Sequence, residues 1–252
     1  MAQARIAPGR SAPGRAALTR SRLAAVAALA AIVALSLIAA SLLGARGGGG
    51  GGSSPGVAVS GASQVERLLQ GIPQEASVLG EPGAPVTLVE YADLQCPFCA
   101  QWAATTFPEL VDRYVRAGLL RVELRGLAFI GPDSETALRT ALAAGEQDRL
   151  WHVVELLYLN QGGENAGWVD EELLSRIARS VPGLDENRLL AVAGSEAVGA
   201  SLADSAGAAE AAGVTGTPWF ELGPTGGDLH RLEVSSLGPG EFRAAIDALL
   251  AG

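Results

Sequence analysis

The sequence predicts an α/β fold in which two cysteines follow a central buried strand, and three observations support this prediction. A β-branched apolar run, 85–91, leads through a turn into Cys96-Pro97-Phe98-Cys99, and helix-forming residues follow. Residues 120–127 alternate apolar and charged side chains, as a half-buried strand does. A long helical stretch then separates this β-α-β unit from a region that has the pattern of a β-hairpin followed by a helix, 216–250.

The other elements follow from caps, breaks and periodicity. Ser63–Gln70 has the pattern of a short amphipathic helix capped by Ser63, and 78–79 that of a short strand. The helix that carries the cysteines should run to about Ala117, with a kink or restart at Pro108 and a stop at Gly118. Glycine and proline breaks delimit five further helices, which make a helical insert at about 132–213: 134–144, 148–160, 170–179, 186–193 and 195–212.

The hairpin and the last helix complete the expected fold. Strands over 216–222 and 229–234 should pair through a turn at Gly226-Gly227-Asp228. An amphipathic helix over 240–250 should follow them. The folded domain is therefore expected to occupy 61–252, which is long enough to bury a substantial core.

The N-terminal segments predict export. Residues 1–22 form a basic tail, 23–43 carry no charge and are long enough to span a bilayer, and 44–60 form a Gly/Ser-rich linker. Arginines before the apolar run place the tail in the cytoplasm and the domain outside, as a single-pass protein of the cell membrane. A cleaved signal peptide is the alternative, although its apolar region is usually only about 7–15 residues long.

The charge distribution excludes one class of partner. All 18 basic residues are arginines, six of them precede Gly47, and no acidic residue does. The exported part is therefore more acidic than the whole chain, whose net charge is −9. So acidic a domain argues against binding to nucleic acid and to anionic membrane surfaces.

The Cys-x-x-Cys pair at a helix start predicts redox chemistry. Free N–H groups at the helix N-terminus favour a thiolate on Cys96, and Pro97 suits the first helical position because its missing N–H has no partner there. A structural zinc site needs four ligands, but the chain has only these two cysteines and two distant histidines. A passive local disulfide remains an alternative to a redox-active pair, and no metal or other cofactor is expected.

The order of these elements, together with Cys96-Pro97-Phe98-Cys99 and Gly216-Thr217-Pro218, resembles the DsbA-type thiol–disulfide oxidoreductases of the thioredoxin fold. The resemblance covers about 78–250. It implies that Cys96 is an exposed nucleophile, that Cys99 resolves the mixed disulfide, and that Cys96 and Cys99 form a redox-active disulfide. It also implies that Pro218 is a cis-proline facing this disulfide and exposing the Thr217 backbone to a substrate strand.

Three further site residues follow from the resemblance. Glu90 stands six residues before Cys96, where thioredoxin-like proteins place a buried acid, and could take the proton of Cys99. The alternative for Glu90 is a half-exposed strand carboxylate. Phe98, between the cysteines, and Trp219, after the proline, would contact substrate, although Trp219 could simply pack.

The resemblance implies an extracytoplasmic oxidase that gives its disulfide to exported or unfolded cysteine-containing proteins and is recycled by a membrane thiol oxidase. The chain lacks the histidine that strongly oxidising members carry between their cysteines. We therefore expect a moderately acidic Cys96, with a pKa of roughly 4.5–6.5, and a moderate oxidant. A reductase or isomerase, and a redox-inactive binding module on the same fold, are the alternatives.

Overall fold

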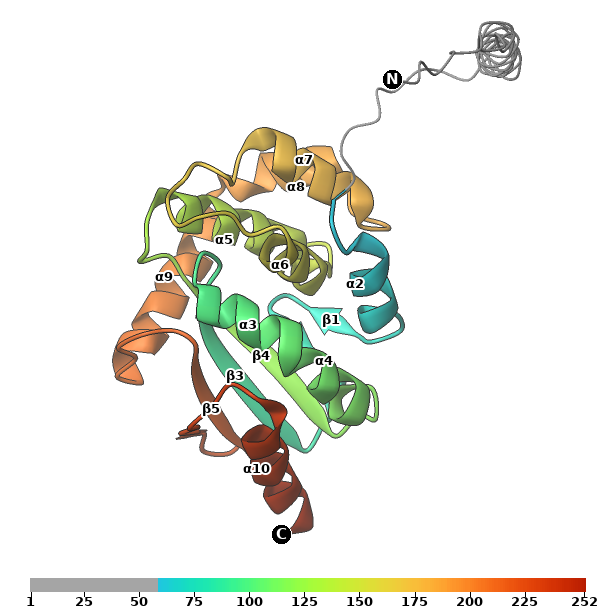
Figure 1. Ribbon diagram of the computed structural model, residues 1–252, viewed down its shortest axis with the longest axis vertical. Coiled ribbons are helices and arrows are strands. Elements are labelled where there is room, and N and C mark those ends of the chain that lie inside the picture. Colours follow the sequence, from blue (N-terminus) through green and yellow to red (C-terminus); the bar gives the residue numbers. More distant parts are fainter. Residues whose placement is uncertain (1–58) are drawn as a thin grey trace, which may run out of the picture. The chain divides into compact units, whose positions relative to one another are not determined.

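A six-stranded sheet forms the centre of the molecule in this computed structural model, which describes residues 59–252 (Figure 1). The strands lie in the order β1-β2-β4-β3-β5-β6. At the centre, β3 pairs in parallel with β4 on one side and antiparallel with β5 on the other. The α/β fold predicted from the sequence is therefore confirmed. The strand bounds are β1 Gln74–Glu75, β2 Val78–Leu79, β3 Val86–Asp93, β4 Leu120–Leu127, β5 Trp219–Pro224 and β6 His230–Arg231.

The helices divide into those that flank the sheet and those that form the insert between β4 and β5. The first group consists of α2 Ala62–Leu69, α3 Pro97–Thr105, α4 Phe107–Leu110, the π-helical turn η2 Val111–Val115 and α10 Pro239–Ala251. The insert consists of α5 Pro132–Gly145, α6 Leu150–Leu159, α7 Glu171–Ser180, α8 Glu186–Ala193 and α9 Glu196–Ala211. The five predicted helices are all present, with bounds within two residues of those expected from the sequence.

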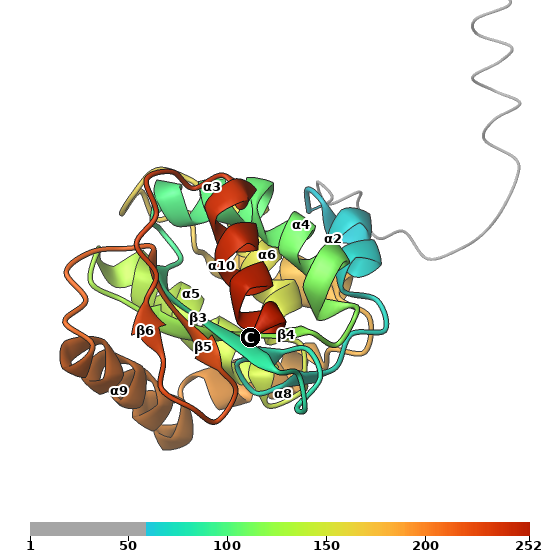
Figure 2. The same cartoon turned by 90° about the horizontal axis from the view of Figure 1, so that it is seen from below.

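The central strand β3 is buried along its whole length because helices cover both faces of the sheet. Alternate residues such as Leu88 and Ala92 point into the cluster that contains Trp102 of α3 and Phe242 of α10. The residues between them, Val89 and Tyr91, pack on the other face with a second cluster to which α9 contributes. Figure 2 shows α10 and α9 on opposite sides of β3 and β5.

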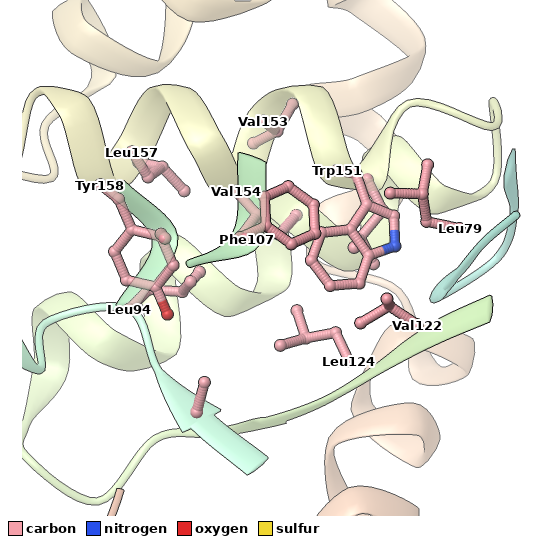
Figure 3. Close-up of a cluster of buried hydrophobic side chains, with 14 of the residues drawn as sticks. Leu79, Leu94, Phe107, Val122, Leu124, Trp151, Val153, Val154, Leu157 and Tyr158 are labelled. Atoms are coloured by element: carbon pink, nitrogen blue, oxygen red, sulfur yellow. The ribbon is translucent and has the colours of Figure 1, made fainter. Parts of the chain in front are cut away.

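Helix α6 ties the insert to the sheet domain. Every residue from Leu150 to Tyr158 is buried, so this helix runs through the core rather than over it. The ring of Trp151 stacks on Phe107 with 5.0 Å between the centroids and 11° between the planes. Figure 3 shows this stack beneath α6, with Tyr158 of the same helix at the far end of the cluster.

Two local predictions need correction. The first helix is capped by Gly61 in a left-handed conformation, with φ +81°, so Ser63 lies inside the helix and caps nothing. The outer hairpin strand is shorter than predicted, because only His230 and Arg231 pair with β5 while the following apolar residues turn toward the core. The prediction for the cysteine-bearing helix is confirmed: the helix breaks at Thr106, restarts as α4 with Pro108 in its first turn, and continues through η2 to Gly118, whose φ of +70° ends it.

The predicted tail, 1–22, the predicted anchor, 23–43, and all but the end of the predicted linker, 44–60, lie outside the described residues. Within 59–252, no helix combines the length and the hydropathy that a membrane span requires.

Candidate active site

The junction between β3 and α3 places both cysteines in the first turn of the helix. The chain turns after the strand, where the Cys96 N–H donates to the Asp93 carbonyl at 2.9 Å. Cys96 is the N-cap residue of α3, and Pro97 takes the first helical position, as predicted. Cys99 follows on the inner face of the same turn, where it is 0% exposed. Neither sulfur is in a disulfide, so the site is in its dithiol form.

The pKa values of the two thiols are shifted in opposite directions. The pKa of Cys96 is lowered to about 6, mainly by a hydrogen bond from the Cys99 thiol. Burial acts in the opposite direction and raises this pKa. Hydrogen bonds with Thr217 and with the backbone N–H groups of Cys99 and Phe98 lower it further. Burial, the hydrogen bond to Cys96 and the charge of Glu90 raise the pKa of Cys99 well above that of a free thiol. Cys96 is therefore the thiol that ionises near neutral pH, and its pKa lies within the range expected from the sequence.

Cys96 is less accessible than predicted, because only 5% of it is exposed. The segment before β5 covers it: the Cys96 Sγ lies 3.4 Å from the Thr217 carbonyl oxygen. The Thr217–Pro218 peptide bond is cis, as predicted. The Thr217 backbone therefore borders the Cys96 sulfur.

The surface around Cys96 offers apolar side chains and a hollow. Phe98 is 60% exposed, and Phe129, which the sequence analysis did not single out, is 58% exposed. A hollow of about 320 Å³ is lined by Pro218, Trp219 and the segment 231–234. Trp219 is partly buried and the Arg231 guanidinium lies 3.9 Å above its ring, so this tryptophan packs and also lines the hollow.

Glu90 lies in the interior of β3 and is 1% exposed, so the alternative of a half-exposed carboxylate is wrong. Its Oε1 has no hydrogen-bond partner among the described residues. Burial, the charge of Glu155 and the charge of Cys96 all raise the pKa of Glu90. A protonated Glu90 close to Cys99 is the state that such an environment favours.

Asp93 holds the loops around the cysteines together and is fully buried. Its Oδ1 accepts from the Gln95 N–H at 2.9 Å and the Ser134 hydroxyl at 2.6 Å, and its Oδ2 accepts from the N–H groups of Phe129 and Ile130 at 3.1 Å each. Three of these four bonds join the end of β3 to the start of the insert, and the bond from Gln95 lies within the turn before Cys96. Asp93 therefore has a structural role at the site.

Two buried polar residues of α6 near the cysteines were not singled out in the sequence. Glu155 is 5% exposed, and its Oε1 has no partner among the described residues. Tyr158 is also buried, and its hydroxyl donates to the Asp93 carbonyl at 3.5 Å. The signal available was a glutamate within an otherwise apolar helix. His152 of the same helix is packed: its Nδ1 pairs with the Gln74 amide at 3.0 Å.

Comparisons with known proteins agree with this arrangement. The family model described as thioredoxin matches residues 74–232. The chain is 34% identical over 110 residues to the probable disulfide bond formation protein D of Bacillus anthracis, covering 42% of this chain and 51% of that protein. The chain thus spans about half the length of this curated relative.

Solved structures show the same fold over most of the chain. The oxidised BdbD of Bacillus subtilis superposes with a TM-score of 0.62 at 21% identity, covering 72% of this chain and 98% of that one. A thioredoxin-like oxidoreductase from Silicibacter pomeroyi DSS-3 gives a TM-score of 0.54 at 28% identity, covering 74% and 98%. Since the family model spans more than half of the sequence and includes both cysteines, the chain belongs to the thioredoxin family.

Proposed function

We propose that this protein is a thiol–disulfide oxidoreductase that oxidises cysteine pairs in exported proteins through Cys96 and Cys99. The observation that carries the proposal is the contrast between the two thiols on one helical turn. Cys96 has a pKa of about 6 and lies under a backbone carbonyl that a substrate can approach, whereas Cys99 is buried with a raised pKa. The names of the relatives in Bacillus support the same activity.

The oxidation would proceed through two exchanges. A substrate thiolate attacks the Cys96 sulfur of the Cys96–Cys99 disulfide, a mixed disulfide forms, and Cys99 leaves with the electron pair. A second substrate thiolate attacks the substrate sulfur of the mixed disulfide and releases Cys96 as a thiolate. The substrate has then lost two electrons and the enzyme has become a dithiol. The low pKa of Cys96 makes it a good leaving group in the second step.

Substrate would bind across Pro97, Phe98, Thr217, Pro218 and Trp219. The Thr217 carbonyl lies beside the reacting sulfur and is placed to accept a hydrogen bond from an extended substrate chain. The exposed Phe98 ring and the hollow beside Pro218 would hold apolar side chains of an unfolded protein. Glu90 would supply a proton to Cys99 when its bond to Cys96 opens.

The location and the recycling partner are part of the proposal. We infer that the apolar run, 23–43, anchors the chain with the domain outside the membrane, and that a membrane thiol oxidase restores the Cys96–Cys99 disulfide. This would place the domain where exported chains emerge. Carbonate treatment of membranes tests the anchor, because a shortened protein released into solution would indicate a cleaved signal peptide instead.

Trapping experiments test the activity. Cys99→Ala should accumulate mixed disulfides on Cys96, because the resolving thiol is absent, and Cys96→Ala should abolish oxidation of a reduced, unfolded substrate. A non-reducing gel and a substrate-thiol assay read the two outcomes. If Cys96→Ala retains substrate binding and the wild type oxidises nothing, the domain is a binding module rather than an enzyme.

The reduction potential distinguishes an oxidase from a reductase. We expect a value between about −270 mV, typical of thioredoxin, and about −120 mV, typical of a strong oxidant. Equilibration of the Cys96–Cys99 pair with a glutathione buffer measures it. A value at or below about −270 mV would favour a reductase.

A further inference from the structure

Cys99 cannot exchange its proton with solvent directly. Its side chain is completely buried, and burial, the hydrogen bond to Cys96 and the charge of Glu90 all favour its protonated form. Glu90, the nearest acid, is itself 1% exposed. A proton that leaves or reaches Cys99 during catalysis therefore needs a second carrier beyond Glu90.

A small cavity approaches this interior from the surface between α2, α3 and α6. It has a volume of about 70 Å³, enough for a few water molecules. Helix α2 contributes Gln64, Val65 and Leu68 to its wall, and α3 contributes three alanines. None of these side chains titrates. The titratable groups that line the cavity come from α6 alone, Glu155 and Tyr158.

Glu155 is the group suited to connect the cavity with Glu90. Its carboxyl is 5% exposed, and its Oε1 has no partner among the described residues. Its charge raises the pKa of Glu90, so the two carboxyls interact across the core. Tyr158 directs its hydroxyl to the Asp93 carbonyl, and its pKa is raised well above the ordinary value, so it stays protonated.

The remaining charged groups near this end of α6 are already engaged. His152, one turn before Glu155, lies with its Nε2 3.4 Å from the Glu66 carboxylate of α2, and its pKa is lowered by burial. Of the groups on the neighbouring elements, Glu90 belongs to β3, and Cys96 and Cys99 belong to the start of α3. Asp93 of β3 is engaged by its four hydrogen bonds. Glu155 therefore lines the water-sized cavity, acts by its charge on Glu90, and has no ion-pair partner in the described part of the chain.

We propose that Glu155 carries protons between the cavity bounded by α2, α3 and α6 and the Glu90–Cys99 pair. This inference rests on the proposed function. When Cys99 attacks a mixed disulfide at Cys96, Glu90 first gives its proton through ionised Glu155 to water in the cavity and then takes the proton of Cys99. The Cys96–Cys99 bond forms, and the partner sulfur leaves as a thiolate. When the disulfide opens, a proton travels the same route inward to Cys99.

Single-turnover reaction of the reduced full-length chain with 5,5′-dithiobis(2-nitrobenzoate) separates the two cysteines. The first thionitrobenzoate released reports attack by Cys96, and the second reports attack by Cys99 on the mixed disulfide. In the wild type, the second phase should accelerate as the pH rises through about 8, the pKa to which burial raises Glu155, since only the ionised carboxyl accepts a proton.

Glu155→Gln keeps the size and polarity of the side chain but cannot carry a proton. We expect the rate of its second phase to lose the rise near pH 8 and to be at least about tenfold slower than in the wild type at pH 8.5. General acid–base catalysis typically accelerates a reaction by about 10²–10⁴-fold, and we expect a smaller loss because Glu90 remains. The first phase should be unchanged, which also reports an intact fold. Glu155→Asp should restore the pH dependence, and Glu171→Gln, on the exposed start of α7, should match the wild type.

The outcomes separate this inference from the proposed function. If wild type releases a single thionitrobenzoate, Cys99 does not resolve mixed disulfides and the proposed function fails together with the proton path. If wild type shows both phases and the second-phase pH profile of Glu155→Gln superposes on it, the redox function stands and the role of Glu155 is refuted. A double variant of Glu90→Gln with Glu155→Gln should lose no more than Glu90→Gln alone, because the two acids act in series.

Discussion

The Cys96 thiolate should stabilise the reduced protein at pH 8.5, and this contribution should be lost as the pH falls to 5.5. In the unfolded chain a cysteine has a pKa of about 8.5, whereas Cys96 in the folded dithiol has a pKa of about 6. A lowered pKa contributes stability that is complete above the unfolded value and is lost as the pH falls through the folded value. The window is therefore about pH 8.5 to 6.

The size of the effect follows from these two values. Each pKa unit corresponds to about 1.36 kcal/mol, so a difference of about 2.5 units limits the contribution to roughly 3.4 kcal/mol. Between pH 8.5 and 5.5, about 3 kcal/mol of this should be lost. That is a large fraction of the roughly 5–15 kcal/mol by which domains of this kind are stable. Cys96 is nearly buried, so solvent screening reduces the estimate little.

Denaturant unfolding of the reduced chain and of Cys96→Ala across this pH range isolates the contribution. Glu90 and Glu155 titrate in both proteins, so the difference between the two unfolding free energies reports the thiolate. We expect this difference to fall by about 3 kcal/mol between pH 8.5 and 5.5. A difference that stays constant within about 0.5 kcal/mol, or that changes only above pH 8, would refute a thiolate stabilised in the folded dithiol.

Three substitutions probe the rest of the site. Phe98→His should lower the pKa of Cys96 and raise the reduction potential, because an imidazolium beside the sulfur stabilises the thiolate; an unchanged potential would contradict this. Asp93→Ala should lower the free energy of unfolding by about 3 kcal/mol or more, since it strands several buried donors at about 1–3 kcal/mol each; a loss under about 1 kcal/mol would contradict the role of this carboxylate. Trp151→Ala should cost about 3–5 kcal/mol in a denaturant titration, and a smaller loss would show that α6 repacks.

The sequence predicted the sheet domain well because its signals are local. The alternation from Leu120 to Leu127 coincides with β4, whose burial alternates in the same register. Proline and glycine breaks located the helices of the insert, and α8 has the predicted bounds, Glu186–Ala193. Predictions were poorer where tertiary contacts decide the backbone. Leu232 still donates its N–H to the Phe220 carbonyl of β5, but beyond it the chain leaves the sheet and Val234 packs against the core, a change that no local pattern records.

The site was predicted in part for the same reason. Cys96, Cys99 and Pro218 stand in short motifs, so their elements could be placed from the sequence. The burial of Cys96 beneath Thr217 could not be predicted, because Thr217 lies 121 residues further along the chain. Glu155 carried a usable signal: α6 is apolar all round, which predicts a helix buried on every side, and a glutamate in such a helix must be buried too.

The two cysteines lie on one helical turn but differ in whether they need a proton carrier during catalysis. Cys96, at the N-cap, receives hydrogen bonds that stabilise its thiolate, and it can leave as an anion without a proton carrier. Cys99, three residues on, faces the core, where its thiolate is disfavoured and a proton must accompany each change of bonding. Unpartnered buried carboxyl oxygens such as those of Glu90 and Glu155 lower stability, since burial without a hydrogen bond is unfavourable. The proposed proton path gives them a catalytic role that offsets this cost: Glu90 acts on the Cys99 thiol, and Glu155 acts on Glu90.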